Sequence, residues 1–200
     1  MQILNILPQQ IYKFECGKLL IEKTLTNLKN EQFSLDRENW QVNQTYNVRL
    51  NKDSKYNDLH HWVRKCLNTV KDELQLQCNR LEITSSWGNV SDKNQWHWTH
   101  SHPNSLVSAI LYLTDSNACT WFSVDNFWSS DSVIKLKQDH QVIHKQPTVS
   151  GDLLIFPSSL VHSVDQHQGN QKRYTLSFNA FPCGEIGFPE ESAGIILNVL

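Results

Sequence analysis

The chain of 200 residues is long enough for one domain with a sizeable hydrophobic core. Hydrophobic residues make up 39% of it and charged residues 19%, an ordinary balance for a globular protein. Eighteen basic and 20 acidic residues leave a net charge of −2, so no basic field indicates a nucleic-acid partner. No apolar run approaches the roughly 18 residues that a transmembrane helix needs, so no membrane partner is expected. With no repeat and no linker, we expect a single domain over residues 1–200.

The cysteines and the amino-terminal segment indicate a compartment. Five cysteines are dispersed without a CxxC spacing, at positions 16, 66, 78, 119 and 183. An odd, scattered set is typical of reduced thiols in the cytosol, not of a disulfide framework or a thiolate zinc site. Met1–Pro8 is apolar but has neither a basic n-region nor a small-residue cleavage site, so we expect a strand there and not a signal peptide. These features predict a cytoplasmic protein.

Two segments in the first 80 residues have helical periodicity. Lys18–Asn30 is weakly amphipathic. Asn57–Gln77 has a continuous apolar stripe at helical spacing, formed by Leu59, Trp62, Val63, Cys66, Leu67, Val70 and Leu74. His60 and His61 are adjacent and point in different directions, which argues against a shared metal and favours two solvated residues. We expect both helices to support the main fold from its outer face.

From Leu81 onward the pattern changes to short strands bounded by turn residues. Strands are expected at Leu81–Ser86, Leu106–Thr114, Thr120–Val124, Val133–Leu136, Gln141–His144, Asp152–Phe156 and Arg173–Phe178. Several short strands without interleaved helices favour a sandwich or barrel. The last strand alternates, with a polar face of Arg173, Thr175, Ser177 and Asn179 and an apolar face of Tyr174, Leu176 and Phe178. A polar face directed inward predicts a cavity for a polar ligand.

Three histidines are placed where a metal could bind. His100 and His102 are two residues apart in an extended segment, so both imidazoles project from the same side of the chain. His162 follows a buried strand that Pro157 ends. Two neighbouring ligands and a distant third cover one side of a metal and leave the other side open for substrate and dioxygen. Arg173 lies on the polar face of the last strand, where its planar fork suits a dicarboxylate.

These segments resemble the 2-oxoglutarate/iron(II) dioxygenase superfamily, and within it a small bacterial and phage family of oxygenases. The resemblance runs from about Leu81 to Pro182. It is carried by Ser86-Trp-Gly-Asn89, His100-Ser-His-Pro-Asn-Ser105, Ser108-Ala-Ile-Leu-Tyr-Leu113, Gly151-Asp-Leu-Leu-Ile-Phe-Pro-Ser-Ser-Leu-Val-His162 and Arg173-Tyr-Thr-Leu-Ser-Phe-Asn179. It implies a mainly β, double-stranded β-helix (jelly-roll) fold, with iron(II), 2-oxoglutarate and dioxygen as cofactor and co-substrates.

The resemblance also implies roles for individual residues. His100 and His162 would bind the metal, and His102 stands where most of the superfamily has Asp or Glu. A third neutral ligand leaves the site more cationic, although imidazole suits iron(II). Arg173 would bind the distal carboxylate of 2-oxoglutarate and Tyr112 would add a hydroxyl to it. Thr175 shares the face of Arg173 and is expected beside it.

By the same resemblance, residues 81–182 would form the β-helix core, residues 1–80 its helical and strand support, and residues 183–200 a tail. The implied reaction converts 2-oxoglutarate to succinate and carbon dioxide and hydroxylates a C–H bond of a second, prime substrate. The sequence does not identify that substrate. A prolyl or other protein side chain and a free small molecule both remain open.

Three other interpretations remain open. A cupin has the spacing of Gly151, Pro157 and His162, but Pro103–Val107 lacks the glutamate that a cupin needs after His-x-His. A barrel that binds a ligand without catalysis would suit the set of Trp87, Trp96, Trp98, Trp121 and Trp128, because indoles form broad ligand platforms. Three histidines with an open position also describe a hydrolytic zinc site. His97 is expected at the rim of the site or behind the ligands.

Overall fold

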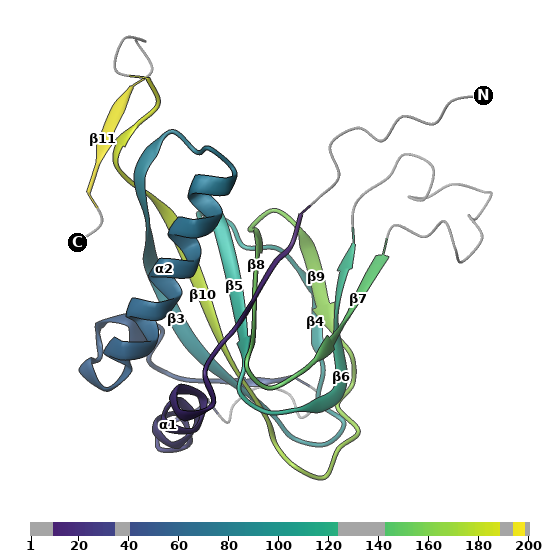
Figure 1. Cartoon of the computed structure of the whole chain (residues 1–200). Coiled ribbons are helices and arrows are strands. Elements are labelled where there is room, and N and C mark those ends of the chain that lie inside the picture. Colours follow the sequence, from purple (N-terminus) through teal and green to yellow (C-terminus); the bar gives the residue numbers. More distant parts are fainter. Residues whose placement is uncertain (1–9, 35–40, 124–142, 189–193, 199–200) are drawn as a thin grey trace, which may run out of the picture.

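The computed structural model describes residues 10–34, 41–123, 143–188 and 194–198, which form two antiparallel β-sheets with two helices (Figure 1). The larger sheet has the order β1-β8-β5-β10-β3-β2, with β11 paired to β10. Its strands are β1 (Tyr12–Glu15), β2 (Asn43–Gln44), β3 (Cys78–Ser91), β5 (Val107–Tyr112), β8 (Asp152–Pro157), β10 (Arg173–Ile186) and β11 (Ile195–Leu197). The smaller sheet has the order β4-β9-β6-β7. Its strands are β4 (His97–His100), β6 (Ser116–Ser123), β7 (Ile143–Thr148) and β9 (Val161–Val164).

This architecture confirms the predicted mainly β jelly roll. Strands β3 and β10 are 14 residues long and pair along nearly their whole length, so both extend well beyond the predicted runs. The extra length comes from ladder hydrogen bonds between distant segments, which local patterns do not reveal. The predicted strands at Met1–Pro8 and Val133–Leu136 lie outside the described residues.

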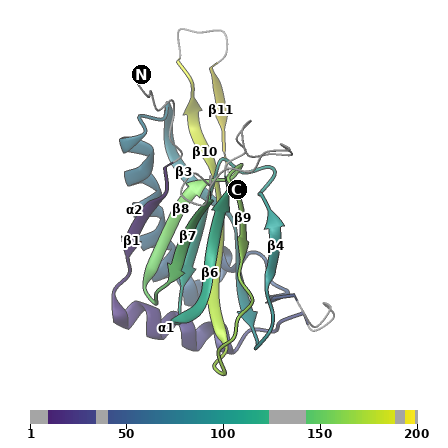
Figure 2. The same cartoon turned by 90° about the vertical axis from the view of Figure 1, so that its right-hand side faces the viewer.

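Helices α1 (Lys18–Lys29) and α2 (Asn57–Glu73) cover the outer face of the larger sheet, as predicted (Figures 1 and 2). Two short 3-10 helices, Leu50–Lys52 and Ser54–Tyr56, lead into α2. The predicted stripe of α2 is buried, except that Trp62 is partly buried and Leu74, at the end of the helix, is 42% exposed. No helix in the described parts of the chain is long and apolar enough to span a membrane.

Close contact between α1 and β3 depends on a glycine. Gly88 lies in β3 beneath Leu28, which is fully buried in the core. A Cβ atom at Gly88 would collide with the Leu28 side chain, so the helix could not pack this close over any other residue. Trp87 and Asn89 flank Gly88 and therefore point to the opposite face of the sheet.

The two faces of β10 belong to different parts of the molecule. Leu176 and Phe178 are buried in the main core between the larger sheet and the helices. Arg173, Thr175 and Ser177 alternate with them and line a cavity between the two sheets. This arrangement confirms the prediction of a polar inner face. A smaller apolar cluster joins the two sheets beside the cavity and contains Ile110, Tyr112, Phe122, Leu154, Phe156 and Leu160.

Leu67→Ala should lower the free energy of unfolding by about 2–5 kcal/mol, because the fully buried side chain would leave a cavity in the main core. Metal affinity should stay that of the parent, because α2 lies on the other face of the sheet from the histidines. Leu19→Ala is the control, since Leu19 is 83% exposed and should change stability little. Denaturant unfolding and metal titration measure both quantities. A folded Leu67→Ala protein that had lost metal binding would contradict this role for α2.

Candidate metal centre

Strand pairing brings His100 and His162 face to face. Strands β4 and β9 are antiparallel neighbours, and His100 is the register partner of His162. The chain then leaves β4, and the backbone N–H of His102 donates a hydrogen bond to the carbonyl of Ser158 at 2.9 Å. This bond holds the His-x-His segment against the turn that leads into β9. The structure thus brings together the three histidines that the sequence singled out.

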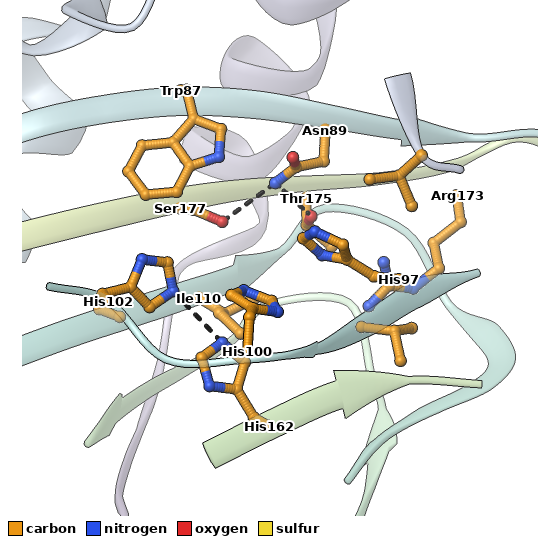
Figure 3. A pocket seen from close by; sticks show the side chains of 13 residues that line it. Trp87, Asn89, His97, His100, His102, Ile110, His162, Arg173, Thr175 and Ser177 are labelled. Carbon is orange, nitrogen blue, oxygen red and sulfur yellow. Dashed lines mark hydrogen bonds between the residues drawn. The ribbon is translucent and has the colours of Figure 1, made fainter. Parts of the chain in front are cut away.

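The three side chains converge on one point (Figure 3). One nitrogen from each lies within 4.8 Å of the others, and Nε2 of His102 is 3.3 Å from Nε2 of His162. Two nitrogens bound to one metal at about 2.1 Å are themselves roughly 3 to 3.5 Å apart, so this separation fits a shared ion. Among the described residues, no other group of three or more His, Cys, Asp or Glu lies this close together.

Backbone carbonyls orient two of the imidazoles. Nδ1 of His100 lies 2.8 Å from the carbonyl of Trp98, and Nδ1 of His162 lies 2.9 Å from the carbonyl of Leu160. A carbonyl only accepts, so each Nδ1 must carry the proton and donate it. The proton-free Nε2 of both rings therefore keeps its lone pair for a metal, which is the arrangement expected behind metal-binding histidines.

Burial keeps all three imidazoles neutral. Desolvation is the main cause, and it lowers the pKa of His162 from 6.5 to about 3 and that of His102 to about 4. The neighbouring His100 contributes in both cases. The pKa of His100 is also lowered by burial, although its hydrogen bond to Trp98 opposes the shift. Neutral imidazole is the form that binds metals, so no proton has to be displaced at neutral pH.

The histidines and Arg173 line the same cavity. The side chain of Arg173 is buried, with the residue 3% exposed, and its Nε has no hydrogen-bond partner among the described residues. Its guanidinium carbon lies 5.6 Å from the centre of the Tyr112 ring. A buried guanidinium without a carboxylate is costly, so this part of the cavity suits an anionic ligand. The cavity therefore combines a place for a metal with a place for a carboxylate.

The other two predicted co-substrate residues differ in position. Thr175 lines the cavity, and its hydroxyl oxygen accepts a hydrogen bond from the Asn89 amide at 3.4 Å. Tyr112 is fully buried beside Arg173, and its hydroxyl is hydrogen-bonded to that of Thr120 at 2.6 Å. It does not line the cavity, so its contact with a co-substrate carboxylate stays a prediction.

The cavity also contains residues that were not predicted to bind the metal or 2-oxoglutarate. Trp87 and Asn89 project into it from β3, and Ser177 projects from the facing positions of β10 (Figure 3). The Asn89 amide donates to Ser177 at 3.0 Å, while its own oxygen is buried without a partner among the described residues. The alternation of β3 could have identified this pair. His97 also lines the cavity, and its ring centre is 4.3 Å from that of His100.

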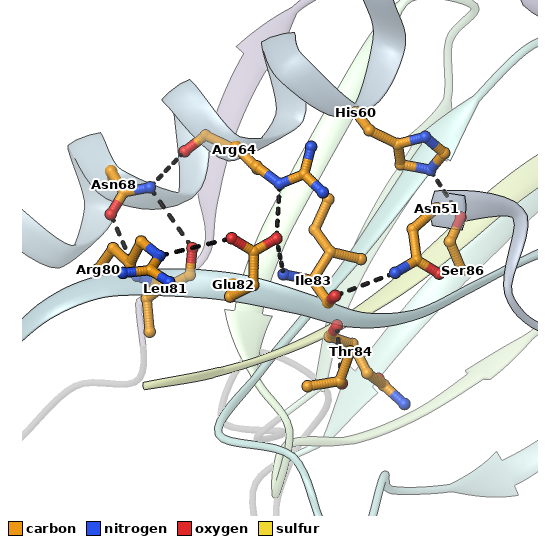
Figure 4. A network of polar contacts seen from close by, with 11 residues as sticks. Asn51, His60, Arg64, Asn68, Arg80, Leu81, Glu82, Ile83, Thr84 and Ser86 are labelled. Carbon is orange, nitrogen blue, oxygen red and sulfur yellow. Dashed lines mark hydrogen bonds and ion pairs between the residues drawn. The ribbon is translucent and has the colours of Figure 1, made fainter. Parts of the chain in front are cut away.

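The prediction that His60 is solvated was wrong, whereas His61 is exposed as expected. His60 is 1% exposed between α2 and β3, and its Nε2 lies 3.2 Å from the Ser86 hydroxyl (Figure 4). His60 lies at the helical spacing of the buried stripe of α2. The prediction treated His60 and His61 as one pair and therefore missed that only His60 faces the core. Together with the Arg64–Glu82 ion pair at 2.6 Å, it fastens α2 to β3 and lies apart from the metal cluster.

Residues 85–179 match the family described as "Putative 2OG-Fe(II) oxygenase". Every predicted metal and co-substrate residue falls within this span. Over this span, the chain is similar to the 2OG-Fe(II) oxygenase family. The family uses iron(II) and 2-oxoglutarate, the cofactor and co-substrate that the sequence predicted. No curated protein matches the sequence.

Solved structures of 2-oxoglutarate oxygenases share this fold. The epimerase SnoN from nogalamycin biosynthesis has a TM-score of 0.67 at 10% identity, over 92% of this chain and 83% of its own. A prolyl-4-hydroxylase from Pseudomonas putida has a TM-score of 0.63 at 13% identity, over 88% of this chain and 94% of its own. HygX from Streptomyces hygroscopicus, with nickel, 2-oxoglutarate and hygromycin B bound, has a TM-score of 0.61 at 12% identity. The match covers 87% of this chain and 83% of HygX. Identities this low establish a common fold and nothing finer.

Metal loading of the protein should persist below the pH at which solvated histidines protonate. The sequence alone predicts loss below about pH 6, where ordinary histidines protonate. Burial moves the pKa of His102 to about 4 and that of His162 to about 3, so both remain neutral at pH 5. Because burial also lowers the pKa of His100, cobalt(II) titrations should show an affinity that falls only below the pH at which solvated histidines protonate. Half-loss near pH 6.5 would mean that the ligands are solvated.

The same shifts fix the direction of the stability change in the metal-free protein. An unfolded histidine has a pKa near 6.5, above that of the buried His102 and His162. Between about pH 6.5 and 4 the unfolded chain therefore binds more protons than the folded one, and stability falls as pH falls. Thermal unfolding across this range checks the sign.

Proposed function

We propose that this 2OG-Fe(II) oxygenase hydroxylates a C–H bond of a prime substrate, with His100, His102 and His162 holding iron(II) and Arg173 holding 2-oxoglutarate. One observation supports this assignment above all. A convergent three-histidine cluster lines the same cavity as a buried guanidinium, whose Nε has no hydrogen-bond partner in the described parts of the chain. Metal and dicarboxylate are the two ligands that such a cavity needs, and they are the two that the family name states.

The histidines have a positioning function. Their lone pairs come from one wall of the cavity, which leaves the opposite side of a metal free for the co-substrate and dioxygen. Carbonyl partners hold His100 and His162, while His102 is held by the main-chain bond to Ser158 and by stacking on His162 with ring centres 5.1 Å apart. Iron(II), when bound, supplies dioxygen activation and the oxidative decarboxylation of 2-oxoglutarate to succinate and carbon dioxide.

Arg173 orients the co-substrate. Its guanidinium can donate two parallel hydrogen bonds to the distal carboxylate, and burial strengthens this pair because water does not compete. Thr175 lies two residues after Arg173 on the same face of β10, so its hydroxyl can donate a further hydrogen bond to this carboxylate. Tyr112 and Thr120 form a buried hydrogen-bonded pair beside Arg173. The resemblance predicts that the Tyr112 hydroxyl contacts the carboxylate, which requires this hydroxyl to rotate away from Thr120.

The choice of prime substrate depends on features beyond the fold. The similar structures include an epimerase, a prolyl-4-hydroxylase and a protein with hygromycin B bound, so the fold alone does not select a substrate. Our candidate substrates are a prolyl side chain of a protein and a small molecule, and the net charge of −2 gives no reason to expect nucleic acid. We also infer a cytoplasmic protein, because its five cysteines are all free.

Dioxygen-dependent turnover separates this proposal from the alternatives. Iron(II)-loaded protein should convert 2-oxoglutarate to succinate, at least slowly without prime substrate, and only when dioxygen is present. A cupin or an inactive barrel would leave 2-oxoglutarate unchanged. A zinc hydrolase would be active with zinc and indifferent to dioxygen. Quantifying succinate under air and under argon, with each metal, gives the answer.

Arg173→Ala should weaken 2-oxoglutarate binding to the metal-loaded protein by about 2–5 kcal/mol, because a buried charge pair loses one partner. Arg173→Lys should recover only part of this loss, since an ammonium cannot form the paired contact. Lys172→Ala is the matched control, because Lys172 is half exposed and pairs with Asp92 on the surface at 3.2 Å. Anaerobic calorimetry gives the affinities. Equal affinities in parent and Arg173→Ala would remove Arg173 from the site.

A further inference from the structure

The proposed site carries an unbalanced positive charge. Three imidazoles bind as neutral ligands, so the metal keeps both of its charges, and Arg173 adds a third. The 2-oxoglutarate dianion cancels two of them. One positive charge remains, which a carboxylate in the position of His102 would have cancelled. This count rests on the proposed function and concerns what else the same cavity binds.

The described walls of the cavity do not supply the missing negative charge. No aspartate or glutamate is among the residues that line it within the described parts of the chain. These are Val42, Trp87, Asn89, His97, His100, His102, Ala109, Ile110, His162, Val164, Arg173, Thr175 and Ser177. A charge among buried side chains such as Arg173 and His162 is costly until an opposite charge joins it. The cavity therefore favours an anion in addition to 2-oxoglutarate.

The geometry places that anion near His102 and Trp87. Figure 3 shows these two side chains on the opposite side of the cavity from Arg173, with the indole of Trp87 directed inward. Their ring centres are 5.7 Å apart. An indole N–H is a donor and never an acceptor, so it suits a negatively charged oxygen. The far end of the cavity is taken by Arg173 and the distal carboxylate.

We propose that the prime substrate is an organic anion, whose singly charged carboxylate group lies beside Trp87 and His102, next to the metal. The anionic group completes the charge balance, and the C–H bond to be oxidised is held beside it. Because one charge is left over, a group with a single negative charge fits best. A neutral substrate of the same shape should bind more weakly.

Acetate and acetamide test this charge preference directly, since they have nearly the same shape. The probe is absorption of the cobalt(II)-loaded protein at saturating 2-oxoglutarate, which reports on the metal environment without turnover. Acetate should bind at least about tenfold more tightly than acetamide, because only acetate meets the unbalanced charge. In His102→Asp the preference should disappear, because the new carboxylate supplies the missing charge.

A second variant does not alter the metal ligands. Trp87→Phe keeps an aromatic ring and removes the N–H, so acetate should bind several-fold more weakly while cobalt(II) and 2-oxoglutarate affinities stay unchanged. Trp121→Phe is its control, since the Trp121 indole is bonded to Asp165 and does not line the cavity.

Failure of this inference is distinguishable from failure of the proposed function. If the parent protein binds cobalt(II) and 2-oxoglutarate but gives equal affinities for acetate and acetamide, only the organic-anion proposal is overturned. If chloride binds and acetate does not, the position holds an inorganic ion and the proposal is overturned too. If cobalt(II) or 2-oxoglutarate does not bind, the proposed function itself is wrong.

Discussion

The pairing of β4 with β9 is the constraint on which the site depends. These strands are far apart in sequence, and their register alone sets His100 opposite His162. The hydrogen bond from His102 to Ser158 then fixes the third imidazole from the same short segment. A shift of one residue in this register would turn His162 to the other face of the sheet. The smaller sheet therefore determines whether a metal can be bound at all.

The larger sheet contributes through β10, because one face of this strand packs in the main core and the other face lines the cavity. Leu176 and Phe178 anchor it in the main core, and the residues between them present Arg173, Thr175 and Ser177 to the cavity. Packing on one face thus limits the movement of the polar groups on the other. The same division holds for β3, where Gly88 admits α1 on the outside and its neighbours face the cavity. The helices matter for function through this rigidity, without touching the site.

Much of this arrangement could be predicted from the sequence, because it follows from the spacing of residues within single helices and strands. The stripe of α2, the alternation of β10 and the His-x-His spacing each follow from one segment, and the structure confirms all three. What the sequence missed depends on long-range contacts. The burial of His60 arises from β3 packing beneath α2, and strand β1 is stabilised by its pairing with β8. Trp87 and Asn89 were not predicted beside the metal, because only the facing sheet turns their side of β3 into a cavity wall.

The imidazoles of His100, His102 and His162 are the three protein ligands proposed for the iron. X-ray absorption spectroscopy of the iron(II)-loaded protein measures this directly, because imidazole rings give multiple scattering that water and carboxylate oxygens do not. Three imidazole ligands are expected in the parent protein and two in His102→Ala. Two imidazoles in both proteins would contradict it, because His102 would then lie in the cavity wall without binding the metal.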